Sequence, residues 1–583
     1  MKRDLQALAS QEFDLIVVGG GIAGISVARD AALRGLSVAL VERGDFASGS
    51  TGHTLGIIHG GMRCLQRLDL GRLRALSVER NALLRNAPHL VHPVPIAVPT
   101  YGQGRDGKSA LHAGFGLYDF LTTHRNDGIA EPSRRLSPSK TLSRKTVLEM
   151  FPGLREAGLT GAAIFTDAQM HQPARLALAL VRSAVDAGAQ AANGLEVTGI
   201  VRKGITVTGV GVRATRSADS FVIQGRMVVN TAGAWAARIL EEGLGLTMDP
   251  PFLFSRRLSF VVNRRPTQRI GLALLDENRD SRTLLSRSKH HLFMLPWRDY
   301  TVLGDWHRSY TGAPDEIDVT DEEVETYVGD INERYPGLRL HPGEVVQRNA
   351  ALGLLERYKG GARGIRDATQ ARLVDHAVVH GTRGIISLVG VTWASARLDA
   401  VGVVDEVFQR IGTTAPPSRT LAVPVYGGDL GSLENLVEEV HEAARAWGFT
   451  RDQARALARN HGTRYGEVFD LVHQDPNLAG SLPGTRVLRA EVVHAVRMEM
   501  AQSLEDLVHR RTDLGLGGLP EPALEEAAYL MRSELGWNAE RTRREVAQVK
   551  VGPTGYDRSG PRVRGDLGES TVESDLVKAN GAS

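Results

Sequence analysis

Cysteine is nearly absent from this sequence. Cys64 is the only cysteine among 583 residues, so the chain cannot form an internal disulfide or a cysteine-based metal site. The count is compatible with a reducing compartment. We expect Cys64 to be a small buried or half-buried side chain without a chemical role.

Long apolar runs are also missing. No segment reaches the roughly 20 apolar residues of a membrane-spanning helix, and residues 1–14 lack the apolar stretch of a secretory signal. We therefore expect a cytoplasmic protein whose membrane contact, if any, is peripheral and on the cytoplasmic face. The net charge of +3 argues against nucleic acid as a partner, although a local cluster of positive charge could attract a phosphorylated substrate.

The first regular pattern begins at residue 13, after a predicted loose leader over 1–11. The run FDLIVV (13–18) is apolar and β-prone, residues 22–34 have helical spacing, and LSVALV (36–41) predicts a second strand. Gly35 is well placed to end the helix. Together these segments predict a βαβ unit.

A glycine fingerprint lies in the first turn of this unit. Gly19 permits a tight turn, Gly21 lets the backbone approach a pyrophosphate, and Gly24 allows the helix to pack closely on the strand. The helix N-terminus offers unpaired N–H groups to the phosphates. Glu42 ends the second strand, where a carboxylate can accept hydrogen bonds from the ribose hydroxyls of adenosine. We therefore predict a dinucleotide-binding site.

Three separate segments favour FAD over NAD. The stretch 43–61 is rich in Gly, Ser and Thr and can run close to a large planar ligand, and the predicted strands 226–230 and 384–389 each lead into a glycine-containing turn. A flavin enclosed by three segments fits this spacing, whereas NAD would need mainly the first. Beyond the fingerprint and Glu42, the predicted cofactor-binding residues are Arg43, Ser50, Thr51, His59, Gly60, Gly61, Ala232, Gly233, Gly390, Val391 and Thr392.

Later segments predict further domains. Strand-like pieces at 258–263, 291–296 and 300–305 indicate an inserted sheet, and residues 433–545 have helical spacing. The tail has little to bury and is predicted to be disordered. We predict an α/β fold with a discontinuous FAD-binding domain (12–95, 150–235 and 370–412), a β-rich substrate-binding domain (96–149 and 236–369), a C-terminal helical domain (420–545) and a disordered tail (546–583).

Longer motifs lie in every part of the chain. They are DLIVVGGGIAGISVARDAALRGLSVALVERGDFASGSTG (14–52), IIHGGMRCLQRLDLGRLRALSVERNALLRNAPHLVHP (57–93), VVNTAGAWA (228–236), YTVLGDWHRSYTG (300–312), LVDHAVVHGTRGIISLVG (373–390), RNHGTRYGEVFDL (459–471) and AEVVHAVRMEMAQSLEDLVHRRTDLGLG (490–517). On these motifs the chain resembles the FAD-dependent glycerol-3-phosphate dehydrogenase family, as a divergent member, over roughly residues 12–545.

The resemblance implies both a fold and a reaction. The implied fold is a Rossmann-like FAD domain of the glutathione-reductase type with an inserted antiparallel β substrate domain and a C-terminal α-helical cap. The implied reaction is oxidation of sn-glycerol 3-phosphate to dihydroxyacetone phosphate, with hydride transfer from C2 to flavin N5. The electrons would then pass to a quinone in the membrane or to O2, and the chain could form a homodimer.

The substrate motifs depart from the family pattern. Arg63 and Arg397 match two family arginines, and arginine can donate paired hydrogen bonds to phosphate. Residues 349–355 match the family's Tyr-Ser-Gly-Val-Arg-Pro-Leu and place Gly353 at its arginine, while Thr392 replaces a family lysine. Each lost contact to an anion costs about 1.5–3 kcal/mol. Compensating charges, each of which could equally be a solvated surface group, are Arg348, Arg256, Arg257, Lys289 and Arg308.

A third departure falls at residues 304–307, where the family has Gly-Thr-Thr-Asp and this chain has Gly-Asp-Trp-His. Trp306 and His307 would make the pocket larger and flatter, and His307 could act as a base with Asp305 as its partner. The predicted catalytic residues are His307 and Arg63, and the predicted substrate-binding residues are Arg63, Arg397, Arg348 and Trp306.

Three functions stay open at this point. The first is a glycerol-3-phosphate dehydrogenase with rearranged charges, the second is an FAD-dependent dehydrogenase or oxidase acting on another hydroxyl or amine, and the third is a non-catalytic flavin-binding scaffold. The intact cofactor motifs argue against the third, and the replacements at Gly353 and Thr392 argue against the first. The first is preferred, because the resemblance includes the helical domain.

Overall fold

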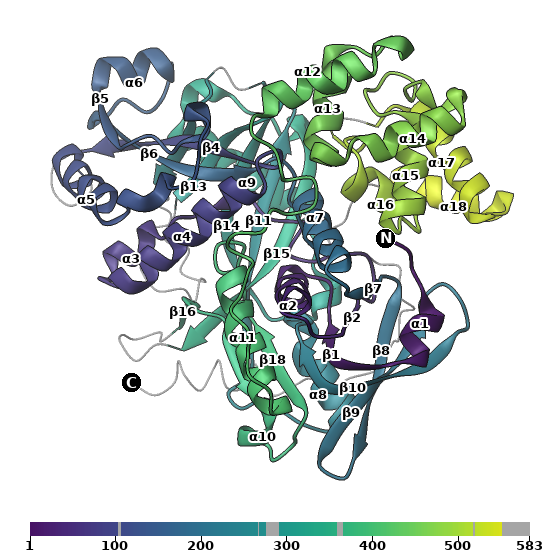
Figure 1. Cartoon of the computed structure of the whole chain (residues 1–583). Helices are drawn as coiled ribbons and strands as arrows, with labels where there is room; N and C mark the ends of the chain where they lie inside the picture. The colour runs from purple at the N-terminus through teal and green to yellow at the C-terminus, as the bar shows by residue number, and fades with distance from the viewer. Residues whose placement is uncertain (103–106, 266–267, 276–290, 358–364, 517–518, 551–583) are drawn as a thin grey trace.

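Two sheets and a bundle of helices make up the protein (Figure 1). The computed structural model describes residues 1–102, 107–265, 268–275, 291–357, 365–516 and 519–550. Lys289 and most of the predicted tail lie outside the described residues.

The first sheet carries the N-terminal βαβ unit. Its strand order is β17-β18-β10-β1-β2-β7, and the four pairings from β18 to β7 are parallel. The antiparallel strands β8 and β9 extend it from β10. The strands are β1 (Glu12–Val18), β2 (Val38–Val41), β7 (Gln190–Ala192), β8 (Leu195–Lys203), β9 (Thr206–Ala214), β10 (Ser220–Asn230), β17 (Arg372–Asp375) and β18 (Ile385–Val389).

Apolar side chains cover both faces of this sheet, as a parallel sheet requires. One face packs against α2 (Ile22–Leu33), α7 (Pro173–Asp186) and α11 (Ala396–Ile411). The other face packs against α1 (Leu5–Ser10) and α8 (Ala236–Leu244). A short helix, α10 (His376–Val379), joins β17 to β18. The Rossmann-like arrangement predicted from the sequence is confirmed.

The second sheet is mostly antiparallel and has the strand order β16-β15-β11-β14-β13-β12-β4-β6-β3, with β5 paired to β6. Helix α9 (Asp321–Arg334) packs on one face through Val324, Tyr327 and Ile331. The strands are β3 (Ile57–Ile58), β4 (Val91–Tyr101), β5 (Lys140–Ser143), β6 (Leu159–Met170), β11 (Leu253–Val262), β12 (Gly271–Leu275), β13 (His291–Trp297), β14 (Tyr300–Tyr310), β15 (Val345–Arg357) and β16 (Ile365–Asp367).

The remaining helices form two groups. Around the second sheet lie α3 (Met62–Gln66), α4 (Leu70–Asn86), α5 (Lys108–Leu121) and α6 (Arg144–Met150). The C-terminal helices, which we call the cap, form a separate bundle at the upper right of Figure 1. The cap comprises α12 (Leu433–Ala443), α13 (Arg451–His461), α14 (Gly466–Gln474), α15 (Arg489–Glu499), α16 (Leu504–Asp506), α17 (Glu521–Leu535) and α18 (Ala539–Lys550).

Buried ion pairs join the cap to the first sheet. Asp45, in the loop after β2, accepts hydrogen bonds from Arg510 at 2.7 Å and from Arg511 at 2.8 and 2.7 Å. Arg175 on α7 pairs with Glu499 of the cap at 2.7 Å. All of these side chains are buried, so each charge depends on its partner.

Four sequence predictions need correction. Residues 5–10 of the predicted loose leader form α1, because Leu8 packs into the core beneath the first sheet. Strands β3 and β6, and the start of β4, belong to the second sheet although we assigned them to the FAD-binding domain. Helix α8 was assigned to the substrate domain but packs on the first sheet. The predicted tail begins too early, since α18 continues to Lys550.

Candidate cofactor and substrate site

The turn between β1 and α2 leaves no room for side chains. Gly19 has a φ of +105°, a left-handed value that favours glycine. A Cβ on Gly24 would lie 2.0 Å from the carbonyl oxygen of Gly19, so the helix can approach the strand only with glycine at that position. Gly21 is the N-cap of α2, and Ile22 N–H donates to Thr51 Oγ1 at 2.9 Å. Gly19 and Gly24 therefore have the turn and packing roles predicted from the sequence, and the role of Gly21 stays a prediction.

Glu42 lies beside this turn at the end of β2. One carboxylate oxygen accepts from Gly20 N–H at 2.6 Å and the other from Gly44 N–H at 2.8 Å. Burial raises the pKa of Glu42, and the two backbone donors oppose that rise. Each oxygen has further lone pairs with which to accept a ribose hydroxyl.

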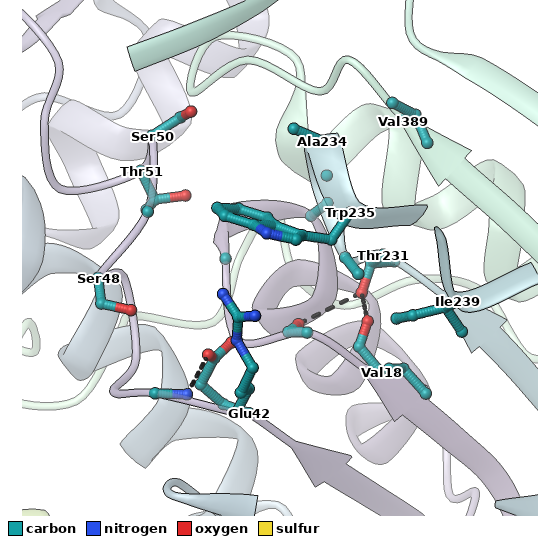
Figure 2. Close-up of a pocket in the computed structure, with 18 of the residues that line it drawn as sticks. Val18, Glu42, Ser48, Ser50, Thr51, Thr231, Ala234, Trp235, Ile239 and Val389 are labelled. Carbon is teal, nitrogen blue, oxygen red and sulfur yellow. Dashed lines mark hydrogen bonds between the residues drawn. The ribbon is translucent and has the colours of Figure 1, made fainter. Parts of the chain in front are cut away.

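A cavity extends from Glu42 past the β1–α2 turn to Leu352 and Leu354 on β15 and to the end of β18. Figure 2 shows its middle, where the Trp235 indole lies between the Ser48–Thr51 stretch and Thr231. The sequence-predicted cofactor residues that line it are Gly19, Gly21, Glu42, Arg43, Ser50, Thr51, Ala232, Gly233, Gly390 and Val391. Gly24, His59, Gly60, Gly61 and Thr392 do not line it.

A cluster at one side of the cavity was not predicted. Asp315, in a short 3-10 turn between β14 and α9, accepts hydrogen bonds from Arg43 at 2.9 Å, Trp235 Nε1 at 2.8 Å and Arg238 at 2.7 Å. The Arg43 guanidinium also lies 5.1 Å from the Trp235 ring centroid. Trp235 directly follows the Thr231-Ala232-Gly233-Ala234 turn. Its position next to a predicted cofactor-binding turn could have identified it from the sequence.

These residues fit FAD. The glycine turn and the N-terminus of α2 suit a pyrophosphate, and Glu42 suits a ribose. At the far end, Leu352, Leu354 and Val391 supply apolar surface beside Gly390, where a planar ring system can lie. The Ser50 hydroxyl accepts from Leu352 N–H at 2.9 Å, so the 43–61 stretch is fastened to the second sheet at this end.

The His-Gly-Gly segment is held by a buried ion pair. Asp167 on β6 accepts from Gly60 N–H at 3.0 Å, pairs with the guanidinium of Arg80 and lies 3.2 Å from His59 Nδ1. Tyr118 donates to the carbonyl of Gly60 at 2.8 Å. Burial of Asp167 opposes ionisation, but the charge of Arg80 and the His59 contact outweigh it and lower the pKa of Asp167. No local pattern in the sequence points to Asp167 or Arg80.

The His59 ring is thereby oriented. Its side chain is 49% exposed, and because Nδ1 faces Asp167, Nε2 is left to face outward. The ring also lies 6.1 Å from that of Phe293 on β13, which places it beside the second sheet. A half-exposed imidazole whose second nitrogen contacts a carboxylate is the usual arrangement of a general base.

His307 occupies a different environment, in which it contacts Asp305, its predicted partner. Nε2 lies 2.8 Å from Asp305 and Nδ1 lies 3.6 Å from Asp367, and only 3% of the side chain is exposed. Burial would lower the pKa of His307, but the charge of Asp305 and hydrogen bonds to both carboxylates raise it.

Three predicted substrate contacts lie elsewhere. Trp306 is buried under α9, with its ring 5.4 Å from that of Tyr327. Arg348 pairs with Asp321 at 2.6 Å on the same side of the sheet. Arg397 pairs with Glu79 at 2.6 Å between α11 and α4. Trp306 and Arg348 were misplaced because alternate residues of a strand face opposite sides, and the sequence did not show which side α9 covers. Arg397 lies on a helix, where Glu79 holds its guanidinium.

The other predicted charges divide between the two sides of the sheet. Arg256 donates to Asp318 O at 2.6 Å, and Arg308 lies 3.5 Å from the Trp306 ring centroid, so both lie on the α9 side. Arg257 faces the opposite side, with Asp367 at 3.1 Å. Arg63 lies in α3, and its side chain is outside the described part of the chain. Thr392 Oγ1 contacts Ser395 Oγ at 3.1 Å within its own turn.

Comparison with known proteins agrees with this fold and cavity. Residues 14–398 match the family described as FAD dependent oxidoreductase, and residues 418–542 match the C-terminal domain of alpha-glycerophosphate oxidase. The chain is therefore an FAD-dependent oxidoreductase.

Its relatives define the family more narrowly. The chain is 30% identical to a glycerol-3-phosphate dehydrogenase of Mycobacterium leprae over 99% of this chain and 93% of the relative, and 28% identical to one of Synechocystis over 93% and 97%. It belongs to the FAD-dependent glycerol-3-phosphate dehydrogenase family. The solved structure of glycerol-3-phosphate dehydrogenase from Bacillus halodurans complexed with FAD is 23% identical, covers 94% of this chain and 95% of its own, and superposes with a TM-score of 0.72. That likeness supports the fold.

Proposed function

We propose that this protein oxidises sn-glycerol 3-phosphate to dihydroxyacetone phosphate. The observation that carries the proposal is the match to relatives named glycerol-3-phosphate dehydrogenase along nearly the whole chain, cap included. The contact between His59 and Asp167 supplies a group that this chemistry needs.

The residues divide the work between binding and proton transfer. FAD, when bound, supplies the acceptor for the hydride that leaves C2 of the substrate. His59 Nε2 takes the proton of the C2 hydroxyl, while Asp167 holds the ring through Nδ1 and stabilises the imidazolium that forms. Arg80 keeps Asp167 ionised, so it acts as a positioning residue behind the base.

The proposal is tested by adding sn-glycerol 3-phosphate anaerobically to the purified yellow protein and following the long-wavelength flavin band. Rapid bleaching is expected, and sn-glycerol 1-phosphate, its mirror image, serves as the matched control. A flavin that stays oxidised with the 3-phosphate but is reduced by dithionite would refute the proposal.

A second candidate function has one observation in its favour. Asp305 and Asp367 lie on the same side of the second sheet as His307, and carboxylates there suit a substrate with a hydroxyl or amine better than one with a phosphate. The same anaerobic assay with uncharged polyols and primary amines tests this alternative.

We also propose that the electrons pass to a quinone or to O2, on the cytoplasmic side of a membrane that the protein contacts peripherally, as a homodimer. None of the described helices has the length and apolar character needed to span a bilayer. Turnover with a soluble quinone under argon, compared with hydrogen peroxide formation in air, distinguishes the acceptors. Vesicle co-sedimentation and light scattering test the membrane contact and the dimer.

A further inference from the structure

Two histidines and a glutamate meet inside the cap, and the proposed function uses none of them. His461 is the last residue of α13, and His494 and Glu499 lie on α15 (Figure 1). Each side chain offers one ligand atom, and the three atoms lie within 4.8 Å of one another. The two imidazole rings are nearly perpendicular, with their centroids 4.9 Å apart. All three residues are buried, His461 being the most exposed at 3%.

One polar atom of each residue lacks a hydrogen bond. His461 Nδ1, His494 Nδ1 and Glu499 Oε1 are buried and have no hydrogen-bond partner among the described residues. His494 Nδ1 and Glu499 Oε1 lie 3.8 Å apart, which is close to the roughly 3.4 Å between two ligands of a tetrahedral zinc ion. Leaving a buried polar atom unpaired is destabilising, so three such atoms in one cluster indicate a ligand that all three share.

The other nitrogen of each ring faces a carboxylate. His461 Nε2 lies 3.4 Å from Glu491, and His494 Nε2 lies 3.2 Å from Glu467. Arg182 lies 3.5 Å from His494 Nε2, farther away than the carboxylate. A histidine that binds a metal through one nitrogen typically donates its other N–H to a carboxylate, which orients the ring and makes it a better ligand. Both rings have this arrangement.

Two arginines border the cluster without bonding to the atoms that lack a hydrogen bond. Arg175 donates to Glu499 Oε2 at 2.7 Å, so Oε1 stays available. Arg182 donates to Glu467 at 2.7 Å and lies 3.7 Å from Glu499 Oε1, beyond hydrogen-bond distance. These guanidinium groups repel a cation, and the carboxylates of Glu467, Glu491 and Glu499 offset that repulsion.

We propose that His461, His494 and Glu499 bind a divalent transition-metal ion, zinc, as a structural site of the cap. Two imidazoles and a carboxylate suit zinc, and a water molecule completes the tetrahedron. Since the chain has a single cysteine, a metal site in it depends on nitrogen and oxygen ligands. The ion joins α13 to α15 and, through the ion pair of Glu499 with Arg175, fastens the cap to α7.

The first test measures metal in the FAD-loaded protein as purified. Elemental analysis after gel filtration in chelator-free buffer is expected to find about one zinc ion per FAD. The protein is then stripped with dipicolinate and titrated with Co2+, which in a tetrahedral site absorbs at longer wavelength than the oxidised flavin. Purified protein without bound metal, together with no cobalt band on titration, would overturn the proposal and leave water as the occupant.

The second test locates the ion with variants. His494→Gln is expected to lose the metal and the cobalt band, and Glu491→Gln, which changes only a group behind a ligand, to weaken zinc binding about 10-fold to 100-fold. His380→Gln is the matched control: His380 Nδ1 lies 3.0 Å from His376 Nδ1, but no third ligand joins that pair among the described residues. Full metal content in His494→Gln, or equal loss in His380→Gln, would overturn the proposal. Glu491→Gln decides alone if His494→Gln does not fold.

The third test concerns stability. An ion that binds only the folded chain stabilises it, so dipicolinate is expected to lower the thermal midpoint of the unmodified protein by several degrees, and added zinc to restore it. The midpoint of folded His494→Gln should respond to neither. An unmodified protein whose midpoint is the same with and without its metal would overturn the structural role.

Discussion

Asp167 is one carboxylate with three partners. It contacts His59, the Gly60 amide and Arg80, and only 3% of its side chain is exposed. A buried carboxylate with this set of donors has its position fixed. His59 therefore presents its outer nitrogen in one orientation, as the base we propose requires.

Replacing the proposed base should remove turnover without removing the cofactor. His59→Gln is expected to lower kcat by about 10²–10⁴, the usual contribution of a general base, with KM little changed. Rapid-reaction measurement of flavin reduction checks this, and the bound-FAD spectrum of the variant is the control. An unchanged reduction rate would contradict the assignment.

The site residues differ in whether the sequence alone could predict them. Gly19, Gly21 and Glu42 were predicted because their chemistry is local to one turn. Trp306 and His307 were adjacent candidates for one pocket, yet they face opposite sides of β14. Asp167 lies 108 residues from His59, and no local pattern connects them.

The close packing of helix α2 on strand β1 depends on the glycine turn. Gly24→Ala would place a Cβ 2.0 Å from Gly19 O and push the helix away from β1, so we expect a folded or partly folded protein purified without FAD. Gly402→Ala in the middle of α11 meets nothing within 4 Å and should be neutral or stabilising by up to about 1 kcal/mol. The flavin-to-protein absorbance ratio of both variants is the measurement. Full FAD occupancy in Gly24→Ala would be the contrary result.

Helices and strands in which apolar residues recur regularly were predicted at the right positions. Their assignment to domains was less successful. The strands at 13–18 and 384–389 and the helix of α11 follow the apolar pattern. The placement of β3 and β6 in the second sheet depends on long-range antiparallel pairing, which hydrophobic periodicity does not encode. Helix α1 was not predicted either, because it has a single buried residue, Leu8, and one apolar residue sets no periodic pattern.

Across the whole molecule, buried histidines near the cap predict acid sensitivity. Burial, with nearby arginines, lowers the pKa of His89 to about 3, of His92 to about 4 and of His509 to about 3. An unfolded histidine has a pKa of about 6.5, so the unfolded chain takes up protons that the fold excludes. The contribution of these histidines to the free energy of unfolding should be complete above pH 6.5 and should be lost as the pH falls towards 4.

Thermal or urea unfolding at pH 7.5, 6.5 and 5.5 checks the sign of this dependence. His89→Asn removes one of the excluded protons and should flatten the decline, since the side chain no longer titrates. Stability that is constant, or that rises, between pH 7.5 and 5.5 would contradict the expectation.

The junction of the cap also predicts a large stability effect. Asp45→Asn leaves Arg510 and Arg511 buried without their full counter-charge, and breaking a buried pair costs about 3–5 kcal/mol. Arg497→Gln, which loses a half-exposed pair with Glu534, should cost about 0–1 kcal/mol. Denaturant titration of both variants measures the difference, and equal effects would show that the Asp45 cluster does not hold the cap.

Asp45 stands three residues after Glu42, so one short loop faces the cofactor on one side and the cap on the other. Any free energy by which bound FAD favours docking of the cap through this loop equals the free energy by which the docked cap favours FAD binding. An enzyme that has lost its FAD would therefore loosen at the cap and be cut there first by proteases.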